Sequence, residues 1–271
     1  MAEEIVTDKK QIKRIKLYID GLDQEMEGGI PEGHVVLLCG TAGTMKSSLA
    51  FNVLYNEVVN NNKVGVYISL EQSASSLINH MVNMGFDMSK ISVFIINDFS
   101  ELDERINKAK LSKGSLIMAD LGTIRKEVKR TTTNPTGDWF NVIKNLLKKI
   151  KTNIGCNFFV LDSLNALYVL SGFENPRTEL FYAFEFFRDM ELTTFLVSEM
   201  PLDGSKFGYY EVEDFLADGV IKIELVARQR KVTREITVVK MRKTACNTDV
   251  FSLEVDRGRF RALYGGQTAL I

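Results

Sequence analysis

One stretch of nine residues combines glycines, a lysine and hydroxyl side chains in an order that suits phosphate binding. It reads Gly-Thr-Ala-Gly-Thr-Met-Lys-Ser-Ser over residues 40–48, directly after the apolar run Val35–Cys39. Glycines permit a tight turn whose backbone N–H groups converge on phosphate oxygens at the start of a helix. In the pattern G-x-x-x-x-G-K-[ST], the lysine reaches the β- and γ-phosphates and the hydroxyl holds Mg²⁺. The stretch therefore predicts a loop that binds a nucleoside triphosphate.

This predicted loop assigns roles to individual residues. Lys46 would contact the phosphates and Ser47 would hold Mg²⁺. The nucleotide-binding set is Thr41, Ala42, Gly43, Thr44, Met45, Lys46, Ser47 and Ser48. Met45 stands where the pattern has its second glycine. If position 45 adopts left-handed torsions, methionine costs roughly 1–2 kcal/mol of strain; if its torsions are ordinary, the cost is mainly crowding near the phosphates. The alternative to a phosphate loop is an ordinary strand-to-helix turn.

Two carboxylates stand where they could complete such a site. Asp162 ends the apolar run Phe158–Leu161, as expected for a strand buried on both faces. It fits an acid that supports Mg²⁺ through the ion's water shell, and a helix cap or turn is the alternative. Glu71 follows the predicted strand 64–69 and could orient the water that attacks the γ-phosphate. Alternatively, Glu71 is an acid at the start of a helix, stabilised there by the helix dipole. The position of Glu71 alone does not decide between these roles.

Other reactive residue types exclude several classes of site. His34 and His80 are the only histidines and lie far apart in the sequence, so a catalytic triad or a histidine-ligated metal is not expected. Cys39, Cys156 and Cys246 form no C-x-x-C pair, which argues against zinc and disulfides and favours a reducing cytosol. The net charge of −1 gives no overall basic field, and no signal peptide or membrane span is visible.

The order of predicted elements indicates an α/β fold. With 271 residues, 45% of them apolar, the chain is expected to form one domain over 1–271, with a basic leader at 1–14. Alternating strands and helices predict a mainly parallel twisted sheet flanked by helices, with antiparallel strands near the C-terminal end. Predicted strands cover 35–39, 64–69, 91–96, 158–162, 194–198, 219–226, 235–242 and 250–256. Predicted helices cover 46–60, 73–84, 139–151 and a stretch starting at Pro176. Residues 130–137 read as an exposed loop.

A set of short motifs follows one another in a specific order. The motifs are Gly21-Leu22-Asp23, Gly28-Gly29-Ile30-Pro31-Glu32-Gly33, the loop 40–48, Ser69-Leu70-Glu71, Leu161-Asp162-Ser163, Ala217-Asp218-Gly219-Val220-Ile221 and Lys240-Met241-Arg242. The first motif and Asp218-Gly219-Val220-Ile221 are weak on their own, but the ordered set is specific. It resembles the KaiC-like branch of the RecA superfamily, which is widespread in archaea. The resemblance spans roughly residues 15–263, as one ATPase module where KaiC carries two in tandem.

The resemblance implies a RecA-like P-loop NTPase core and roles for further residues. Glu71 occupies the position of the catalytic base, and Asp162 that of the Walker B acid. Lys240 and Arg242 would reach the γ-phosphate held by a neighbouring subunit of a hexameric ring, where extra cations can supply large rate factors. Without the resemblance, these two cations would be outward residues of an alternating strand. Ser198-Glu199 matches a strand end that senses nucleotide state.

The expected function is a cytosolic, Mg²⁺-dependent ATPase that assembles as a ring and uses hydrolysis to switch conformation or partner. Met45, and Gln72 where many relatives have a second glutamate, lead us to expect slow hydrolysis. One alternative is an ATP sensor or scaffold with negligible turnover, like archaellum-motor relatives. Another is a recombination accessory protein that contacts DNA through 130–137, 200–214 or the basic leader. DNA is not favoured because the loop 200–214 holds more acids than bases. Autophosphorylation is assigned to no particular serine or threonine.

Overall fold

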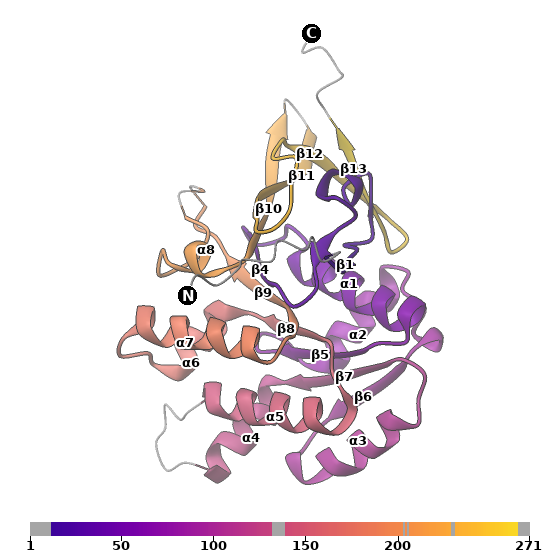
Figure 1. The fold of residues 1–271 in the computed structure, drawn as a ribbon, viewed down its shortest axis with the longest axis vertical. Helices are drawn as coiled ribbons and strands as arrows, with labels where there is room; N and C mark the ends of the chain where they lie inside the picture. Colours follow the sequence, from indigo (N-terminus) through magenta and orange to yellow (C-terminus); the bar gives the residue numbers. More distant parts are fainter. Residues whose placement is uncertain (1–11, 132–138, 203, 205, 229–230, 265–271) are drawn as a thin grey trace, which may run out of the picture.

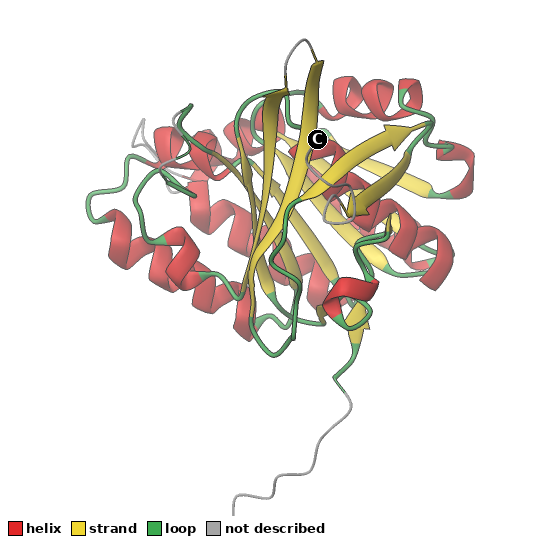
Figure 2. Ribbon diagram, turned by 90° about the horizontal axis from the view of Figure 1, so that it is seen from above, coloured by secondary structure: helices red, strands yellow, loops and turns green. Residues whose placement is uncertain are grey.

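The computed structural model describes residues 12–131, 139–202, 204, 206–228 and 231–264. Within these residues, eleven strands form one sheet with helices on both sides (Figures 1 and 2). They are β2 Ile19–Asp20, β4 Val35–Gly40, β5 Val64–Ser69, β6 Ser92–Ile96, β7 Ser115–Asp120, β8 Phe158–Asp162, β9 Thr193–Glu199, β10 Gly219–Arg228, β11 Lys231–Met241, β12 Phe251–Asp256 and β13 Arg259–Tyr264. A separate pair joins β1 Arg14–Ile15 to β3 Ile30–Pro31. Most of the predicted basic leader lies outside the described residues.

The sheet has a parallel part and an antiparallel part. Its strand order is β2-β13-β12-β11-β10-β4-β9-β8-β5-β7-β6. Every neighbouring pair from β10 to β6 is parallel. The pairs β10·β11, β11·β12 and β12·β13 are antiparallel. The predicted mainly parallel sheet with antiparallel C-terminal strands is therefore confirmed.

Helices cover the two faces of the sheet and bury two apolar cores. One core lies beneath α1 Lys46–Asn61 and α2 Ala74–Asn83. The other lies beneath α3 Leu102–Lys110, α4 Leu121–Thr131, α5 Trp139–Ile154, α6 Leu164–Ser171 and α7 Pro176–Asp189. A short helix, α8 Glu213–Leu216, precedes β10. Adjacent residues of β4 enter opposite cores, because Val36 faces the first and Leu37 the second. This two-sided burial explains why the central strands are continuously apolar.

The structure corrects several sequence-based boundaries. Arg130 and Thr131 were predicted to open a loop but end helix α4, where Arg130 pairs with Asp98 and Ile124 and Val128 pack into the core. The remainder of that predicted loop, 132–137, lies outside the described residues. Among the elements of five or more residues, helices α3, α4 and α6 and strands β7 and β13 were not predicted. The helix predicted over 139–151 continues to Ile154 as α5, and the run predicted over 235–242 begins earlier, at Lys231, as part of β11.

The parallel strands bring their carboxyl ends to one edge of the sheet. Gly40 pairs with Glu199, and Ser69 pairs with Asp162, in the registers of β4·β9 and β5·β8. The phosphate loop and the two predicted acids therefore leave the sheet on the same side. Ligands of open α/β sheets bind outside this edge. The fold positions the candidate site before any side chain is considered.

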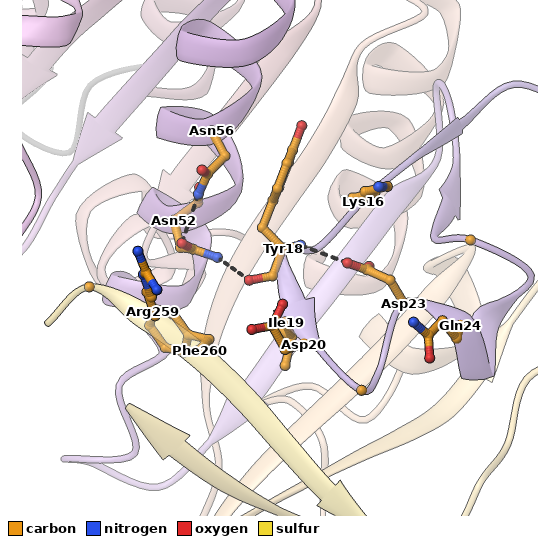
Figure 3. Close-up of a pocket in the computed structure, with 13 residues that line it drawn as sticks. Lys16, Tyr18, Ile19, Asp20, Asp23, Gln24, Asn52, Asn56, Arg259 and Phe260 are labelled. Carbon is orange, nitrogen blue, oxygen red and sulfur yellow. Dashed lines mark hydrogen bonds between the residues drawn. The ribbon is translucent and has the colours of Figure 1, made fainter. Parts of the chain in front are cut away.

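The N-terminal segment anchors the helix that follows the phosphate loop. Figure 3 shows the pocket between this segment, α1 and β13, with a volume of about 520 Å³. The Asp23 carboxylate accepts hydrogen bonds from the backbone N–H groups of Leu17 and Tyr18, at 2.6 and 3.0 Å. The side-chain amide of Asn52 on α1 donates to the carbonyls of the same two residues, at 2.9 and 3.2 Å. Burial raises the pKa of Asp23 to about 6, against the opposing effect of its backbone hydrogen bonds.

Candidate nucleotide-binding site

The loop between β4 and α1 has the backbone conformation of a phosphate-binding turn. Gly43 has a φ of 79°, in the left-handed region that favours glycine. Gly40 is required for a different reason, because a Cβ atom there would lie 2.2 Å from the carbonyl oxygen of Ile223. Inside the loop, the Thr44 hydroxyl donates to the Thr41 carbonyl at 2.8 Å. The loop therefore curls tightly against the neighbouring strand β10.

Met45 adopts the conformation that the sequence analysis identified as the costly one. Its φ is 76° and its ψ is 28°, which is left-handed, and it precedes the first residue of α1. For a residue with a side chain, this conformation costs roughly 1–2 kcal/mol. The Leu49 N–H still donates to the Met45 carbonyl at 2.9 Å, so α1 begins directly after the strained residue.

Lys46 lies at the centre of the site. Its side chain is buried, and its ammonium group donates to the carbonyls of Gly40 and Thr41, both at 2.9 Å. Burial lowers the pKa of Lys46, while the nearby acids Glu199, Asp162 and Glu71 act in the opposite direction, with Glu199 the strongest of the three. The lysine is therefore held against the loop in a largely acidic environment.

Asp162 is the most deeply buried acid of the site, at 2% exposure. Its Oδ2 accepts a hydrogen bond from the Tyr67 hydroxyl at 2.6 Å. Its Oδ1 is buried and has no hydrogen-bond partner among the described residues. Burial raises the pKa of Asp162, and hydrogen bonds from Tyr67 and Ser47 act against that rise. An acceptor of this kind is expensive to bury alone, so Oδ1 has the character of a group made for a ligand.

These groups fit Mg²⁺ bound together with a nucleotide. No cluster of three or more histidine, cysteine or acidic side chains suited to a metal occurs in the described part of the chain. Mg²⁺ does not need such a cluster, since it usually keeps several waters and is bound by one or two protein groups and substrate phosphates. Ser47 and Asp162, brought together here, match that type of site.

Glu71 is oriented by a serine at the start of the next helix. The Ser163 hydroxyl donates to Glu71 Oε1 and accepts the backbone N–H of Ala166 at 3.3 Å. Ser163 is the N-cap of α6, and this N–H already occupies its acceptor side. Its single proton is consequently directed at the glutamate. The hydrogen bond from Ser163 thereby fixes the Glu71 carboxylate in the cavity that the phosphate loop also lines.

Most of the predicted residues line one cavity of about 490 Å³. Those that line it are Ala42, Gly43, Met45, Lys46, Ser47, Ser48, Glu71 and Asp162. Thr41 and Thr44 belong to the loop without lining the cavity, and the Thr44 side chain is buried. Glu199, at the end of β9, and Gln72 also line the cavity.

The sequence analysis missed two lining residues with polar side chains, besides the apolar Val197. Arg234 comes from β11, and its Nε atom is buried without a hydrogen-bond partner among the described residues. His80 comes from α2, with its Nε2 atom 3.4 Å from the Ser48 hydroxyl. Arg234 could have been found from the alternation of side chains along the strand, because it shares a face with the buried Ile236 and Val238. Charged residues are seldom buried, so an arginine on the inward face of a strand is a candidate for a functional site.

Lys240 and Arg242 do not reach this cavity. Lys240 Nζ donates to the Asp214 carbonyl at 2.6 Å, and the Arg242 guanidinium pairs with Asp218 at 2.8 Å. Strand register explains the separation, because Met241 pairs with Gly219, which pairs with Val36 at the amino end of β4. The phosphate loop follows the other end of that strand. Both cations nevertheless contact one segment, 214–218.

Comparison with known proteins places the chain in a family. The family described as ATPase: KaiC matches residues 15–260. The chain belongs to this family of ATPases, as its motifs had indicated. A UPF0273 protein of Methanocaldococcus jannaschii is 27% identical over 86% of this chain and 89% of its own length. The circadian clock oscillator protein KaiC of Prochlorococcus marinus is 25% identical over 87% of this chain, which spans only 42% of that relative.

A solved structure shares the fold. The crystal structure of a KaiC-like protein from Pyrococcus horikoshii aligns with a TM-score of 0.69, at 24% identity, over 93% of this chain and 100% of that one. The likeness confirms the RecA-like fold of the KaiC family. In the described part of the chain, no helix has the length and apolar character needed to cross a membrane.

Proposed function

We propose that this chain binds ATP with Mg²⁺ in the cavity beside the phosphate loop and hydrolyses it slowly, as one ATPase module. The observation that carries the proposal is the convergence of Lys46, Ser47, Glu71 and Asp162 on one cavity at the carboxyl edge of the parallel strands. The family match supports the same conclusion. The three cysteines are free thiols, which supports a reducing, cytosolic setting.

Each side chain has a defined task in this proposal. Lys46 leaves the loop carbonyls and neutralises charge on the β- and γ-phosphates. Glu71, oriented by Ser163, accepts a proton from the attacking water. Mg²⁺ would be held by the Ser47 hydroxyl and indirectly by Asp162, and it supplies charge neutralisation at the phosphates. The strain at Met45 and the glutamine at position 72 support slow turnover.

The proposal extends to an assembly of several copies. Lys240 and Arg242 lie away from their own cavity, and the Arg242 side chain is 49% exposed. This placement suits cations that reach the γ-phosphate bound by an adjacent copy in a ring. Nucleotide state would then be communicated between copies, which is how the ring would act as a switch.

A second candidate is an ATP sensor that binds without appreciable turnover. The left-handed Met45 favours it, since the strain of this residue lies within the loop that would bind the phosphates. DNA binding is not proposed. Measurement of hydrolysis in a single turnover distinguishes the ATPase from the sensor.

The first test replaces the loop lysine. Lys46→Ala should weaken ATP binding by about a hundredfold, because the removed ammonium is a charged partner for two phosphates. Isothermal titration calorimetry measures the affinity. Lys63→Ala is the control, since Lys63 is a partly exposed lysine that pairs with Glu32 away from the cavity. Unchanged affinity of Lys46→Ala would remove the assignment of the phosphate loop.

The second test separates binding from chemistry. Glu71→Gln keeps the size of the side chain but loses the basic carboxylate, so ATP affinity should stay within about twofold while turnover falls by about a hundredfold or more. Calorimetry and phosphate release give the two quantities. A variant that turns over at the wild-type rate would show that another residue activates the water.

A further inference from the structure

A buried tyrosine is bonded to the acid of the site. Tyr67 lies in β5, beside β8, and its side chain is fully buried. Its hydroxyl donates to Asp162 Oδ2 at 2.6 Å, and its ring contacts Phe51 on α1, with centroids 6.2 Å apart. A buried phenol needs a hydrogen-bond partner, and here the partner is a functional carboxylate. Phenylalanine would satisfy the apolar surroundings of the ring equally well, so the hydroxyl calls for a separate explanation.

The hydrogen bond from Tyr67 gives the two carboxylate oxygens of Asp162 different roles. Oδ2 is occupied by Tyr67, whereas Oδ1 is buried without a partner among the described residues. The Ser47 hydroxyl acts to lower the pKa of Asp162 and of Tyr67, and Ser47 lines the cavity together with Asp162. With Oδ2 held from inside the protein, only Oδ1 is left to serve the cavity.

We propose that Tyr67 is a positioning residue, which fixes the Asp162 carboxylate so that Oδ1 serves Mg²⁺ in the nucleotide complex. This inference rests on the proposed ATP and Mg²⁺ binding. Tyr67 itself touches neither ligand. Groups that orient a residue supporting a metal typically change metal affinity by tenfold to a hundredfold when they are removed.

The test removes the hydroxyl and keeps the ring. Tyr67→Phe should weaken Mn²⁺ binding to the protein–ADP complex by about tenfold, as measured by electron paramagnetic resonance with Mn²⁺ as the probe. The KM for Mg²⁺ in hydrolysis should rise by a similar factor, with kcat less affected. ADP affinity in the presence of EDTA should stay within about twofold, because Tyr67 does not contact the nucleotide.

Tyr55→Phe is the matched control. Tyr55 is also buried, contacts the same Phe51 ring and donates its hydroxyl to a carbonyl, that of Asp87, away from the cavity. It should lose stability without losing metal affinity. Equal Mn²⁺ affinity in wild type and Tyr67→Phe would overturn the inference, as would an equal loss in Tyr55→Phe. Wild-type protein that binds neither ADP nor ATP would overturn the proposed function as well, so the two failures are distinguishable.

A second measurement covers the case in which Tyr67→Phe does not fold. Fluorotyrosine placed at position 67 keeps the hydroxyl and provides a ¹⁹F signal. Addition of Mg²⁺ to the protein–ADP complex should shift this signal, because the bonded carboxylate changes its surroundings. The same label at position 55 should not respond. A signal at position 67 that ignores Mg²⁺ would count against the positioning role.

Discussion

At Met45, the backbone adopts a left-handed conformation that a residue with a side chain disfavours. The loop requires a left-handed backbone there, as it does at Gly43, but the chain carries a methionine. Strain of this size persists only where the surrounding structure imposes it, and it is often stored at functional sites. At this position it acts on the turn from which, in the proposed complex, α1 would present its first N–H groups to phosphate.

Met45→Gly is expected to strengthen ATP binding or raise turnover by up to about tenfold, which corresponds to release of roughly 1–2 kcal/mol of strain. Calorimetry and phosphate release under saturating ATP measure the two effects. Asn62→Gly is the control, because Asn62 also has a left-handed backbone at the opposite end of α1 and cannot touch the cavity. A marked loss of both affinity and turnover in Met45→Gly would show that the neighbouring structure has adapted to methionine.

For helices and strands, sequence periodicity predicted the elements that follow from a local residue pattern. It missed the features that depend on how strands pair with one another. The unit β4–loop–α1 was predicted nearly to its boundaries, because an apolar run, glycines and a helical pattern follow one another directly. Glu71 and Asp162 line one cavity because Asp162 ends β8 and Glu71 follows the end of the parallel strand β5, so both lie at one edge of the sheet. Arg234 was missed because it reaches the cavity only through the register of the β10·β11 hairpin. Strand β13 was missed because only two residues, Arg257 and Gly258, separate its alternating pattern from β12.

The N-terminal segment gives an element-scale prediction about pH. Since burial raises the pKa of Asp23 from 3.8 to about 6, the folded state binds this proton more tightly than the unfolded state. The contribution of Asp23 to the free energy of unfolding is therefore greatest below about pH 4 and is lost as the pH rises through 6. We expect a change of about 1–2 kcal/mol, after allowance for partial solvent exposure.

Asp23→Asn should remove that part of the pH dependence between pH 4 and 7. Urea unfolding of the wild type and the variant at several pH values measures it, and the difference between the two slopes isolates Asp23 from other groups. Asp20→Asn is the control, because Asp20 is an exposed acid of the same segment. Identical slopes in wild type and Asp23→Asn would contradict the assigned pKa.

For the whole molecule, the main issue is whether one chain contains a complete site. The resemblance predicted Lys240 and Arg242 as partners of the γ-phosphate, and the structure holds them at the amino end of β4, with the phosphate loop at the other end. No periodicity in a single sequence could have located them, because their proposed target belongs to another copy. Their present partners, the Asp214 carbonyl and the Asp218 carboxylate, hold both cations on one side of the molecule.

Arg242→Ala is expected to bind ATP normally but hydrolyse it about a hundredfold or more slowly, since the cation lost would stabilise the transferring phosphoryl group. Mixing it with Lys46→Ala should restore part of the activity, because some interfaces then combine an intact loop with an intact arginine. Phosphate release during a mixing titration measures the recovery, and differently labelled subunits establish that copies exchange. The absence of recovery in mixed assemblies would argue against a shared site, and full activity of Arg242→Ala alone would dismiss the arginine assignment.

The opposite placement of the loop and the two cations gives each copy a direction. In the proposed ring, each copy brings its loop to the cations of the next copy, so these contacts join unlike surfaces head to tail. A linear chain of such copies always leaves one loop without cations at one end and one pair of cations without a loop at the other. Only closure makes the number of complete sites equal to the number of copies. In this proposal, the specific activity of the protein is itself a measure of whether its assemblies are closed.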